Sequence, residues 1–464
     1  MRKRYLLAVG LTYLLSTPFC WSDVIGLKTA TKVGDKISFT LNAGVKATLK
    51  WGDGTQQETE FASVPQEFVV KSDTLTIETE DLIGMMYCPE NQLVSLNTAG
   101  APALQSLICS DNQLTSLNMD NNTALKELDC QNNLLENLSV SKCKPLTSLN
   151  FAFNNLKSVA ISGLANLRSL ISAGNQLESM YISVMTNLKH LWCQENKMKN
   201  LDISPCKNLI DLYAFDNEME KITVGTKSRL TDIWVDHNNL VNLDLSGVNN
   251  LEVVSADHNQ LTLVEINKEY ESMREYYVHN NALIFNSLPP LTLWDKVVID
   301  DQSPYVLTEK VEVSSVLDLS NILGYTITGS PIIYTLKWFA ANGTPLVQNT
   351  DFSLISRGKY SFLKRLDGVY AEITTGRFPD VTFQFQPFNV VEPTAISDVQ
   401  NNSDRLKVVT TKGQIQITCT ESVPVRVSSV SQIDVFKGDM SAGTHTFSVV
   451  PGVYIVNGIK YVVY

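Results

Sequence analysis

Asparagine recurs with a fixed period along the middle of the chain. Nine asparagines stand 21 residues apart, and a tenth follows after one extra residue: Asn91, Asn112, Asn133, Asn154, Asn175, Asn196, Asn217, Asn238, Asn259 and Asn281. Apolar residues repeat at fixed offsets around them, as in Leu104-x-x-Leu107-x-Cys109-x-x-Asn112-x-Leu114-x-x-Leu117-x-Met119. A period of this length predicts an array of similar structural units and excludes a single globular core.

Numbered from Leu104, the apolar positions of each unit are 1, 4, 6, 11, 14 and 16. The alternation at positions 4 and 6 predicts a short strand, and successive strands should stack about 4.8 Å apart in a parallel sheet. One unit cannot bury its apolar residues alone, so the units must pack on one another. The asparagine at position 9 follows the strand, where its amide can satisfy buried backbone groups. We therefore expect the asparagine row to be structural.

This frame resembles the leucine-rich repeat at its short bacterial length, over residues 83–288. The resemblance implies a mainly β, modular fold, with a solenoid of about ten 21-residue repeats. Before the repeats, residues 23–82 contain alternating runs such as 45–51 and a tight Gly52-Asp53-Gly54 turn. We expect an N-terminal β cap there, because the apolar end of a solenoid has to be covered.

Two further β modules are predicted after the repeats, where Pro289-Pro290 breaks the period. Alternating runs predict a β-sandwich over residues 289–392, and segments 342–346 and 358–362 resemble immunoglobulin-like modules of Bacteroidetes surface proteins. Residues 393–464 predict a last β-sandwich, whose ending at 451–464 resembles the C-terminal sorting domain of type IX secretion. That resemblance implies passage across the outer membrane through the secretion machinery.

The start of the chain predicts export. Three basic residues precede an apolar run at 5–15, which is too short for a membrane span of about 20 residues. This pattern is typical of a secretory signal peptide, here residues 1–22 with cleavage before Asp23. The exported protein is expected at the cell surface, on the outer membrane, or secreted.

The net charge narrows the possible partners. The net charge of −11 has the wrong sign for binding phosphates, so we expect no nucleic acid partner.

Cysteines at position 6 should act as small apolar side chains of the core. Cys143 and Cys206 share position 19 but lie three repeats apart, beyond the reach of a disulfide. We expect at most one disulfide, between neighbouring repeats.

No motif of a familiar hydrolase, metalloprotease or nucleotide-binding enzyme occurs, so we predict a non-enzymatic protein without a cofactor. Four of the five histidines nevertheless lie at outward repeat positions. Asp236-His237 and Asp257-His258 fall on consecutive repeats and offer ligand types that suit zinc. Because these turn positions are solvated and their side chains need not converge, we predict no metal site.

The candidate binding site is a row of aromatic residues. Position 5 should face outward on the concave side. In the second half of the repeat region this position carries Trp192, Tyr213, Trp234 and Tyr277, and Phe215 lies nearby at position 7. Carboxylates surround this row: Asp211, Asp232, Asp236 and Asp257. Exposed aromatic residues within a charged rim are typical of protein-binding surfaces. Alternatively, the rings only pack on each other and stiffen the sheet.

The order of these modules resembles internalin-like surface proteins of Gram-negative anaerobes, which serve adhesion, host interaction or biofilm formation. The resemblance implies a cell-surface adhesin whose concave face binds a host or bacterial surface protein. Two alternatives remain. Aromatic rings beside carboxylates also suit glycan binding or glycan processing, and the solenoid alone can serve structural self-association.

Overall fold

The computed structural model describes residues 22–227, 229–266, 272–284, 288, 295–323, 326–327, 330–331, 333–376, 378–392, 406–411, 413–429, 434–450, 452–457 and 459–463. The predicted signal peptide, Ser22 excepted, lies outside them. The described part is mainly β, and its α-helix α1 (Ser320–Leu323) has four residues. No helix in these ranges is long and apolar enough to cross a membrane.

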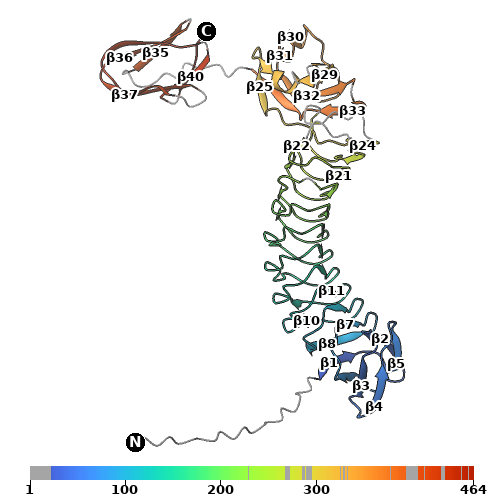
Figure 1. Ribbon diagram of the computed structural model, residues 1–464. Helices are drawn as coiled ribbons and strands as arrows, with labels where there is room; N and C mark the ends of the chain where they lie inside the picture. Colours follow the sequence, from blue (N-terminus) through green and yellow to red (C-terminus); the bar gives the residue numbers. More distant parts are fainter. Residues whose placement is uncertain are drawn as a thin grey trace, which may run out of the picture. The chain divides into compact units, whose positions relative to one another are not determined.

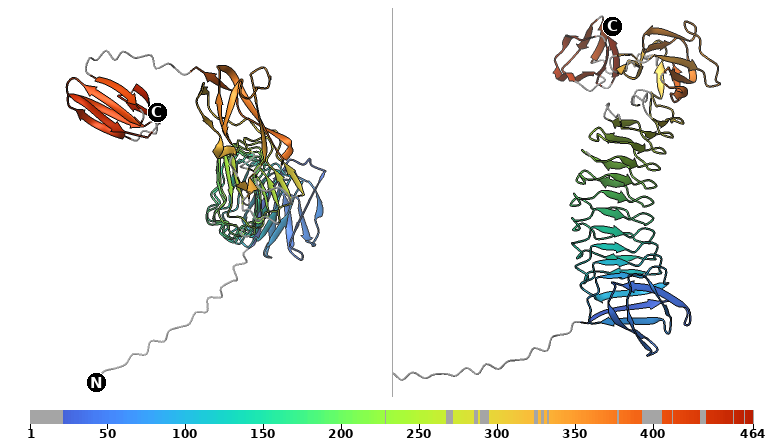
Figure 2. Two further views of the ribbon diagram at one scale, coloured as in Figure 1. Left: turned by 90° about the horizontal axis from the view of Figure 1, so that it is seen from above. Right: turned by 45° about the vertical axis from the view of Figure 1, so that its right-hand side comes forward.

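A long parallel ladder forms one side of the repeat region, as the period predicted. It belongs to a 13-stranded sheet, and neighbouring repeats pair in register. Figures 1 and 2 show the repeats as stacked turns. The parallel strands are β7 (Met85–Tyr87), β9 (Ser106–Ile108), β11 (Glu127–Asp129), β13 (Ser148–Asn150), β14 (Ser169–Ile171), β15 (His190–Trp192), β17 (Asp211–Tyr213), β19 (Asp232–Trp234), β21 (Val253–Ser255), β23 (Glu275–Tyr277) and β24 (Lys296–Val298).

Each strand of this ladder covers positions 3 to 5 of its repeat. From β7 to β23 the residue at position 4 is buried, as Leu191 and Leu212 are, while the side chains at positions 3 and 5 point to the other face of the sheet. We call this outer surface, which corresponds to the predicted concave face, the sheet face.

The asparagine row joins each turn to the one before it. The Nδ2 group of Asn175 donates to the carbonyl oxygens of Phe151, Ser172 and Ala173 at 3.0, 3.2 and 3.2 Å. Its Oδ1 atom accepts the backbone amide of Leu156 at 3.0 Å. Asn112, Asn133, Asn154 and later members repeat this pattern. The row is structural, because it satisfies buried backbone groups that two neighbouring turns leave unpaired.

The second side of the turns carries shorter sheets: β10 (Ser116–Asn118) with β12 (Asn137–Ser139), β16 (Asn200–Asp202) with β18 (Lys221–Thr223), and β20 (Asn242–Leu245) with β22 (Leu263–Ile266). Apolar residues fill the space between the two sides. The seven cysteines among the described residues are all buried and free. Burial raises the pKa of the Cys88 and Cys193 thiols to about 12, so these groups stay protonated and act as apolar core side chains.

The N-terminal β domain continues both sides of the solenoid. Its first sheet has the order β4-β3-β6-β1-β8, in which β8 (Leu93–Gly100) comes from the first repeat. In the long sheet, β2 pairs antiparallel with β7, and β5 pairs with β2. The strands are β1 (Asp23–Thr29), β2 (Lys36–Leu41), β3 (Lys46–Trp51), β4 (Gln56–Glu60), β5 (Gln66–Val69) and β6 (Thr74–Thr79). This shared pairing covers the first turn of the solenoid.

The repeat ladder continues beyond residue 288, where the sequence frame ended. Strand β24 pairs in parallel with β23, and Gln302 stands 21 residues after Asn281. The Nε2 group of Gln302 donates to the carbonyl oxygens of Val278 and Ile299 at 2.8 and 3.0 Å, and its Oε1 atom accepts the amide of Leu283 at 2.7 Å. Glutamine therefore takes the place of asparagine in one further turn.

The chain divides into two compact units. One contains Met1–Leu307, Asn321–Lys337 and Ala371–Gln386, and the other contains Thr308–Ser320, Trp338–Tyr370 and Pro387–Tyr464. This division crosses the predicted immunoglobulin-like region, so the boundaries 289–392 stay a prediction.

Three small sheets are described in the region after the repeats. The largest is β25 (Lys310–Glu312), β34 (Phe388–Val391), β32 (Leu366–Thr375) and β29 (Tyr334–Phe339), with β33 (Phe378–Gln384) paired to β32. The second is β26 (Leu317–Asp318), β31 (Lys359–Phe362) and β30 (Phe352–Ser356), and β27 (Thr326–Ile327) pairs separately with β28 (Ser330–Pro331). Trp338 is buried against Tyr360, Phe362 and Phe388.

The last residues form a β-sandwich of their own. Its sheets are β35 (Leu406–Thr411), β36 (Gln414–Cys419) and β39 (Gly443–Ser448), and β38 (Asp434–Met440), β37 (Val423–Ser429), β40 (Gly452–Val456) and β41 (Ile459–Val463). Their apolar faces enclose a core that includes Ile415, Ile417, Val427 and Tyr454. The predicted fold class is confirmed, while the predicted start of the last module at residue 393 lies outside the described residues.

Candidate functional site

Three aromatic rings meet on consecutive strands of the sheet face. Trp192, Tyr213 and Trp234 stand at position 5 of their repeats, on strands β15, β17 and β19. We call these three residues the aromatic strip. The ring centroids of Trp192 and Tyr213 lie 5.4 Å apart, and those of Tyr213 and Trp234 lie 6.0 Å apart. All three side chains are half-buried. The strip therefore combines packing between the rings with an accessible apolar surface.

Asp211 holds one end of the strip in place. Its carboxylate accepts a hydrogen bond from Nε1 of Trp192 at 2.7 Å, and it lies 2.6 Å from Nδ1 of His190. Only 15% of the Asp211 side chain is exposed. We expected a solvated charge at the rim, whereas this carboxylate positions the indole. His190 was absent from the predicted site, although its place two residues before Trp192 on one strand puts both on the sheet face.

Tyr213, at the centre of the strip, and Trp234, at its far end, are held differently from Trp192. Burial, with smaller contributions from Asp232 and Asp211, raises the pKa of Tyr213, so its hydroxyl stays protonated. Asp232 accepts a hydrogen bond from the Thr231 hydroxyl at 2.5 Å. Nε1 of Trp234 is buried and has no hydrogen-bond partner among the described residues. Trp234 is therefore held by packing alone.

Tyr277 and Phe215 do not join the strip. The buried Ser255 occupies position 5 of β21 and separates Tyr277 from Trp234. The Tyr277 hydroxyl donates to Glu275 at 2.7 Å, and Nζ of Lys296 lies 4.9 Å from the ring centroid. Phe215 is half-buried in the turn that follows β17. Of the predicted aromatic residues, the structure brings three together.

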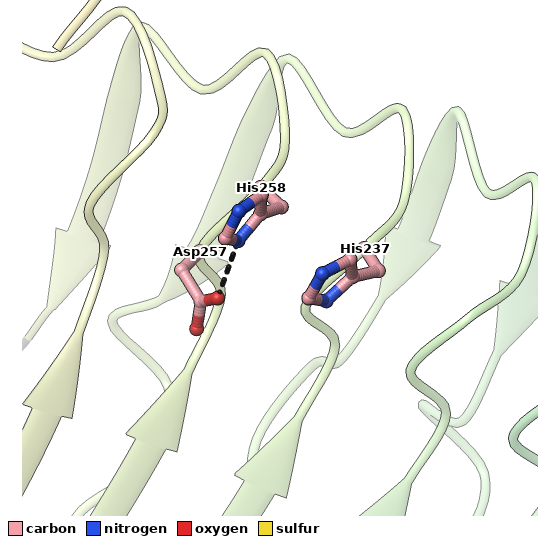
Figure 3. A group of neighbouring side chains, drawn as sticks. All are labelled: His237, Asp257 and His258. Atoms are coloured by element: carbon pink, nitrogen blue, oxygen red, sulfur yellow. Dashed lines mark hydrogen bonds and ion pairs between the residues drawn. The ribbon is translucent and has the colours of Figure 1, made fainter. Parts of the chain in front are cut away.

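Asp236 and Asp257 follow β19 and β21, and each pairs with the histidine next to it. Oδ2 of Asp236 lies 3.1 Å from Nδ1 of His237, and Oδ2 of Asp257 lies 2.8 Å from Nδ1 of His258. The two imidazole rings are stacked, with centroids 4.2 Å apart and planes 11° apart (Figure 3). We saw no reason in the sequence for these turn side chains to converge, and the structure places the two rings in contact.

The backbone of the turn explains this contact. Position 8 is left-handed in turn after turn, with φ of 51° at His237 and 48° at His258, and likewise at Asp111, Asn132, Phe153, Glu195, Asp216 and Asn280. A repeated left-handed residue sends its side chain in the same direction from every turn. Position 8 therefore forms a row along the solenoid, although its residue types vary too much for the sequence to reveal it.

Comparisons with known proteins find similarity among solved structures. No protein-family model and no curated protein matches the chain. The functional domain of InlJ from Listeria monocytogenes, described as including a cysteine ladder, is 16% identical and has a TM-score of 0.34, over 69% of this chain and 94% of that one. An internalin (inlF) from Listeria monocytogenes is 18% identical, with a TM-score of 0.30, over 47% and 81%. The leucine-rich effector protein YopM from Yersinia pestis is 18% identical, with a TM-score of 0.33, over 43% and 67%.

Proposed function

We propose that the protein is an adhesin, displayed at the cell surface or secreted, whose sheet face binds a protein partner in host interaction or biofilm formation. The observation that supports this is the aromatic strip: three half-exposed rings on consecutive strands, with Trp192 fixed by Asp211. Aromatic residues that are already ordered lose little conformational entropy when a partner covers them. The strip is thus suited to be the centre of a protein interface.

Charge indicates the chemistry of the partner. The chain carries a net charge of −11, and the half-buried Asp232 stands beside the strip at position 3 of its repeat. An acidic surface steers basic partners toward it, and an Arg or Lys side chain can lie over an aromatic face, as Lys296 lies over Tyr277. We infer that the partner presents a basic protein surface.

Display at the cell surface rests on the terminal modules. The predicted signal peptide would direct export, and the C-terminal sandwich would act as the sorting domain recognised by the secretion machinery. The immunoglobulin-like region would serve as a spacer. A solenoid whose sheet face presents an aromatic strip supports a binding role, and we propose no enzymatic activity and no cofactor for it.

Glycan capture is the second candidate, and ring geometry makes it weaker. The planes of Trp192 and Tyr213 meet at 58°, and those of Tyr213 and Trp234 meet at 63°. Neighbouring rings at such angles do not form the continuous flat platform on which sugar rings stack. Self-association through the same strip is the third candidate.

Binding of the fluorescently labelled chain to intact host cells and intact bacteria tests the proposal. The Trp234→Ala variant is the most direct probe, because no hydrogen-bond partner of its indole is lost. We expect binding to weaken by at least about 2 kcal/mol, roughly 30-fold. Tyr181→Ala is the matched control, because it removes an aromatic ring that is 72% exposed and is not part of the sheet face. Tyr181 stands at position 15 of its repeat, and in other repeats this position, held by Asn118 and Asp202, belongs to strands of the second side.

Treatment of the cells separates the three candidates. Protease treatment of the cells should abolish binding, and glycosidase treatment should leave it unchanged. Loss of binding after glycosidase alone would identify a glycan ligand. A mass in sedimentation that rises with concentration for the parent chain, and not for Trp234→Ala, would indicate self-association.

A further inference from the structure

Three histidines and a carboxylate gather where the ladder turns away from β19, β21 and β23. His237, His258 and His279 come from consecutive turns. The rings of His237 and His258 are stacked, and His279 meets His258 edge to face at 5.3 Å between centroids. Asp257 lies among them, with its Oδ2 atom 2.8 Å from Nδ1 of His258 and 3.6 Å from Nε2 of His279. This group is distinct from the aromatic strip.

The hydrogen bonds of the group leave metal-binding atoms available. Nδ1 of His237 faces Asp236, so Nε2 of that ring is left to accept a metal ion. Nδ1 of His258 points at Oδ2 of Asp257, so a metal ion can take the place of the proton between these two atoms. A histidine that binds a metal through one nitrogen commonly donates from the other to a carboxylate, which fixes the tautomer and the ring. Asp236 stands in that relation to His237.

We propose that His237, His258 and Asp257 form a binding site for a divalent transition-metal ion of the zinc class. One ligand atom from each of the three residues lies within 4.8 Å of the others. Imidazole nitrogen with carboxylate oxygen is a donor set that suits zinc and its neighbours rather than calcium or magnesium. Three protein ligands leave the fourth tetrahedral position for water or for a group of a partner. This site goes beyond the proposed adhesin function and does not depend on it.

The ligands need only small movements to converge. Tetrahedral zinc with bonds of about 2.0–2.1 Å requires neighbouring ligand atoms roughly 3.3 Å apart, so the stacked rings have to turn toward one another. Their side chains are 49% and 44% exposed, which leaves room for that rotation. The side-chain amide of Asn280 lies 3.1 Å from Nε2 of His258, the ring nitrogen that does not face Asp257.

Asp257 is the fixed part of the site. It is buried, and its Oδ1 atom accepts a hydrogen bond from the Ser255 hydroxyl at 2.9 Å. Each carboxylate oxygen keeps a further lone pair for a metal. A cation bound here would also neutralise two carboxylates, Asp236 and Asp257, that stand on neighbouring turns.

Titration of the full chain with Zn²⁺ and with Co²⁺ tests the site. We expect one ion per chain by calorimetry and the visible absorption of tetrahedral Co²⁺. His237→Asn and His258→Asn should each weaken binding more than tenfold. Asparagine is the appropriate replacement because Asn132 and Asn280 hold the same left-handed position in other turns. His190→Ser is the matched control, since His190 also pairs with an aspartate and Ser106, Ser148 and Ser169 occupy its position elsewhere.

A second measurement on the parent chain avoids any dependence on variant folding. Zn²⁺ should protect His237 and His258 from diethyl pyrocarbonate, read by mass spectrometry, while His190 stays reactive. The proposal is overturned if neither ion binds in stoichiometric amounts, if His237→Asn binds Zn²⁺ as tightly as the parent, or if His190→Ser loses binding to the same extent.

Discussion

Trp192 donates a hydrogen bond from its indole Nε1 to Asp211, which stands on the neighbouring strand of the sheet, at 2.7 Å. The same carboxylate pairs with His190, so one aspartate fixes two side chains of the sheet face. This relationship turns a half-exposed tryptophan into an ordered part of the surface. The proposed interface is thus built before any partner arrives, which lowers the entropic cost of binding.

The Trp192 hydrogen bond should contribute measurably to stability. Trp192→Phe keeps an aromatic ring against Tyr213 and removes the donor, so we expect the free energy of unfolding to fall by about 1–2 kcal/mol. Denaturant unfolding measures it. Trp234→Phe is the control, because Nε1 of Trp234 has no hydrogen-bond partner among the described residues and little should be lost. Equal losses in both variants would argue against the role of Asp211.

Asn175→Ala should lower the free energy of unfolding by about 1–3 kcal/mol, because three carbonyl groups and the amide of Leu156 lose their partner inside the solenoid. Thermal unfolding followed by circular dichroism provides the measurement. Asn155→Ala is the control. It replaces the exposed asparagine that directly follows Asn154 in the sequence, and it should leave the melting temperature nearly unchanged. A normal melting temperature for Asn175→Ala would contradict the structural role of the row.

Asn91 should couple the N-terminal β domain to the first repeat. Its Nδ2 group donates to the carbonyl of Ser38 at 2.7 Å, and its Oδ1 atom accepts the amide of Ser38 at 2.6 Å. We expect Asn91→Ala to speed amide hydrogen exchange in β2 and β7 with little change in β19 and β21, because turns of a solenoid contact only their neighbours. Unchanged exchange in β2 would show that strand pairing alone holds the cap.

Lys227 should make stability depend on pH. Its side chain is buried at position 19, where neighbouring turns carry Cys206 and Val248, and Nζ donates to the carbonyl of Val224 at 2.7 Å. Burial, with a smaller contribution from Lys207, lowers its pKa to about 8 from 10.5. The unfolded chain therefore binds more protons between pH 8 and 10.5, so the Lys227 contribution to stability rises with pH across this window.

Lys227→Met tests this pH dependence. We expect the variant to be more stable than the parent by about 1 kcal/mol at pH 7, because an apolar side chain replaces a buried charge. The difference should shrink as the pH rises from 8 to 10.5, measured by denaturant unfolding at several pH values. A difference that stays constant with pH would contradict a lowered pKa.

Deletion of residues 394–464 should prevent surface display if the last sandwich is the sorting domain. The truncated chain keeps the predicted signal peptide, so we expect it in the periplasm. Antibody labelling of intact cells, compared with labelling after the outer membrane is opened, distinguishes the two locations. Normal labelling of intact cells by the truncated chain would exclude the sorting role.

Periodicity was sufficient to predict the solenoid, because the stacking of units imposes the same buried positions on every turn. Leu107 and Leu191 are both buried at position 4 for this reason, and Asn112 and Asn175 make the same hydrogen bonds. The outward aromatic strip followed from the same count, since side chains alternate along a strand. These features depend on local spacing, which a sequence displays directly.

Other features depend on distances that only the folded chain provides. The asparagine period does not reveal Gln302, whereas in the folded chain a side chain one methylene longer reaches the equivalent carbonyl groups. Asp211 was expected at a solvated rim, and its burial arises from the two partners that surround it. His237 and His258 meet because position 8 is left-handed in both turns. The sequence determined which side chains the row at position 8 contains. The left-handed backbone conformation and the stacking of the turns decided that these side chains touch.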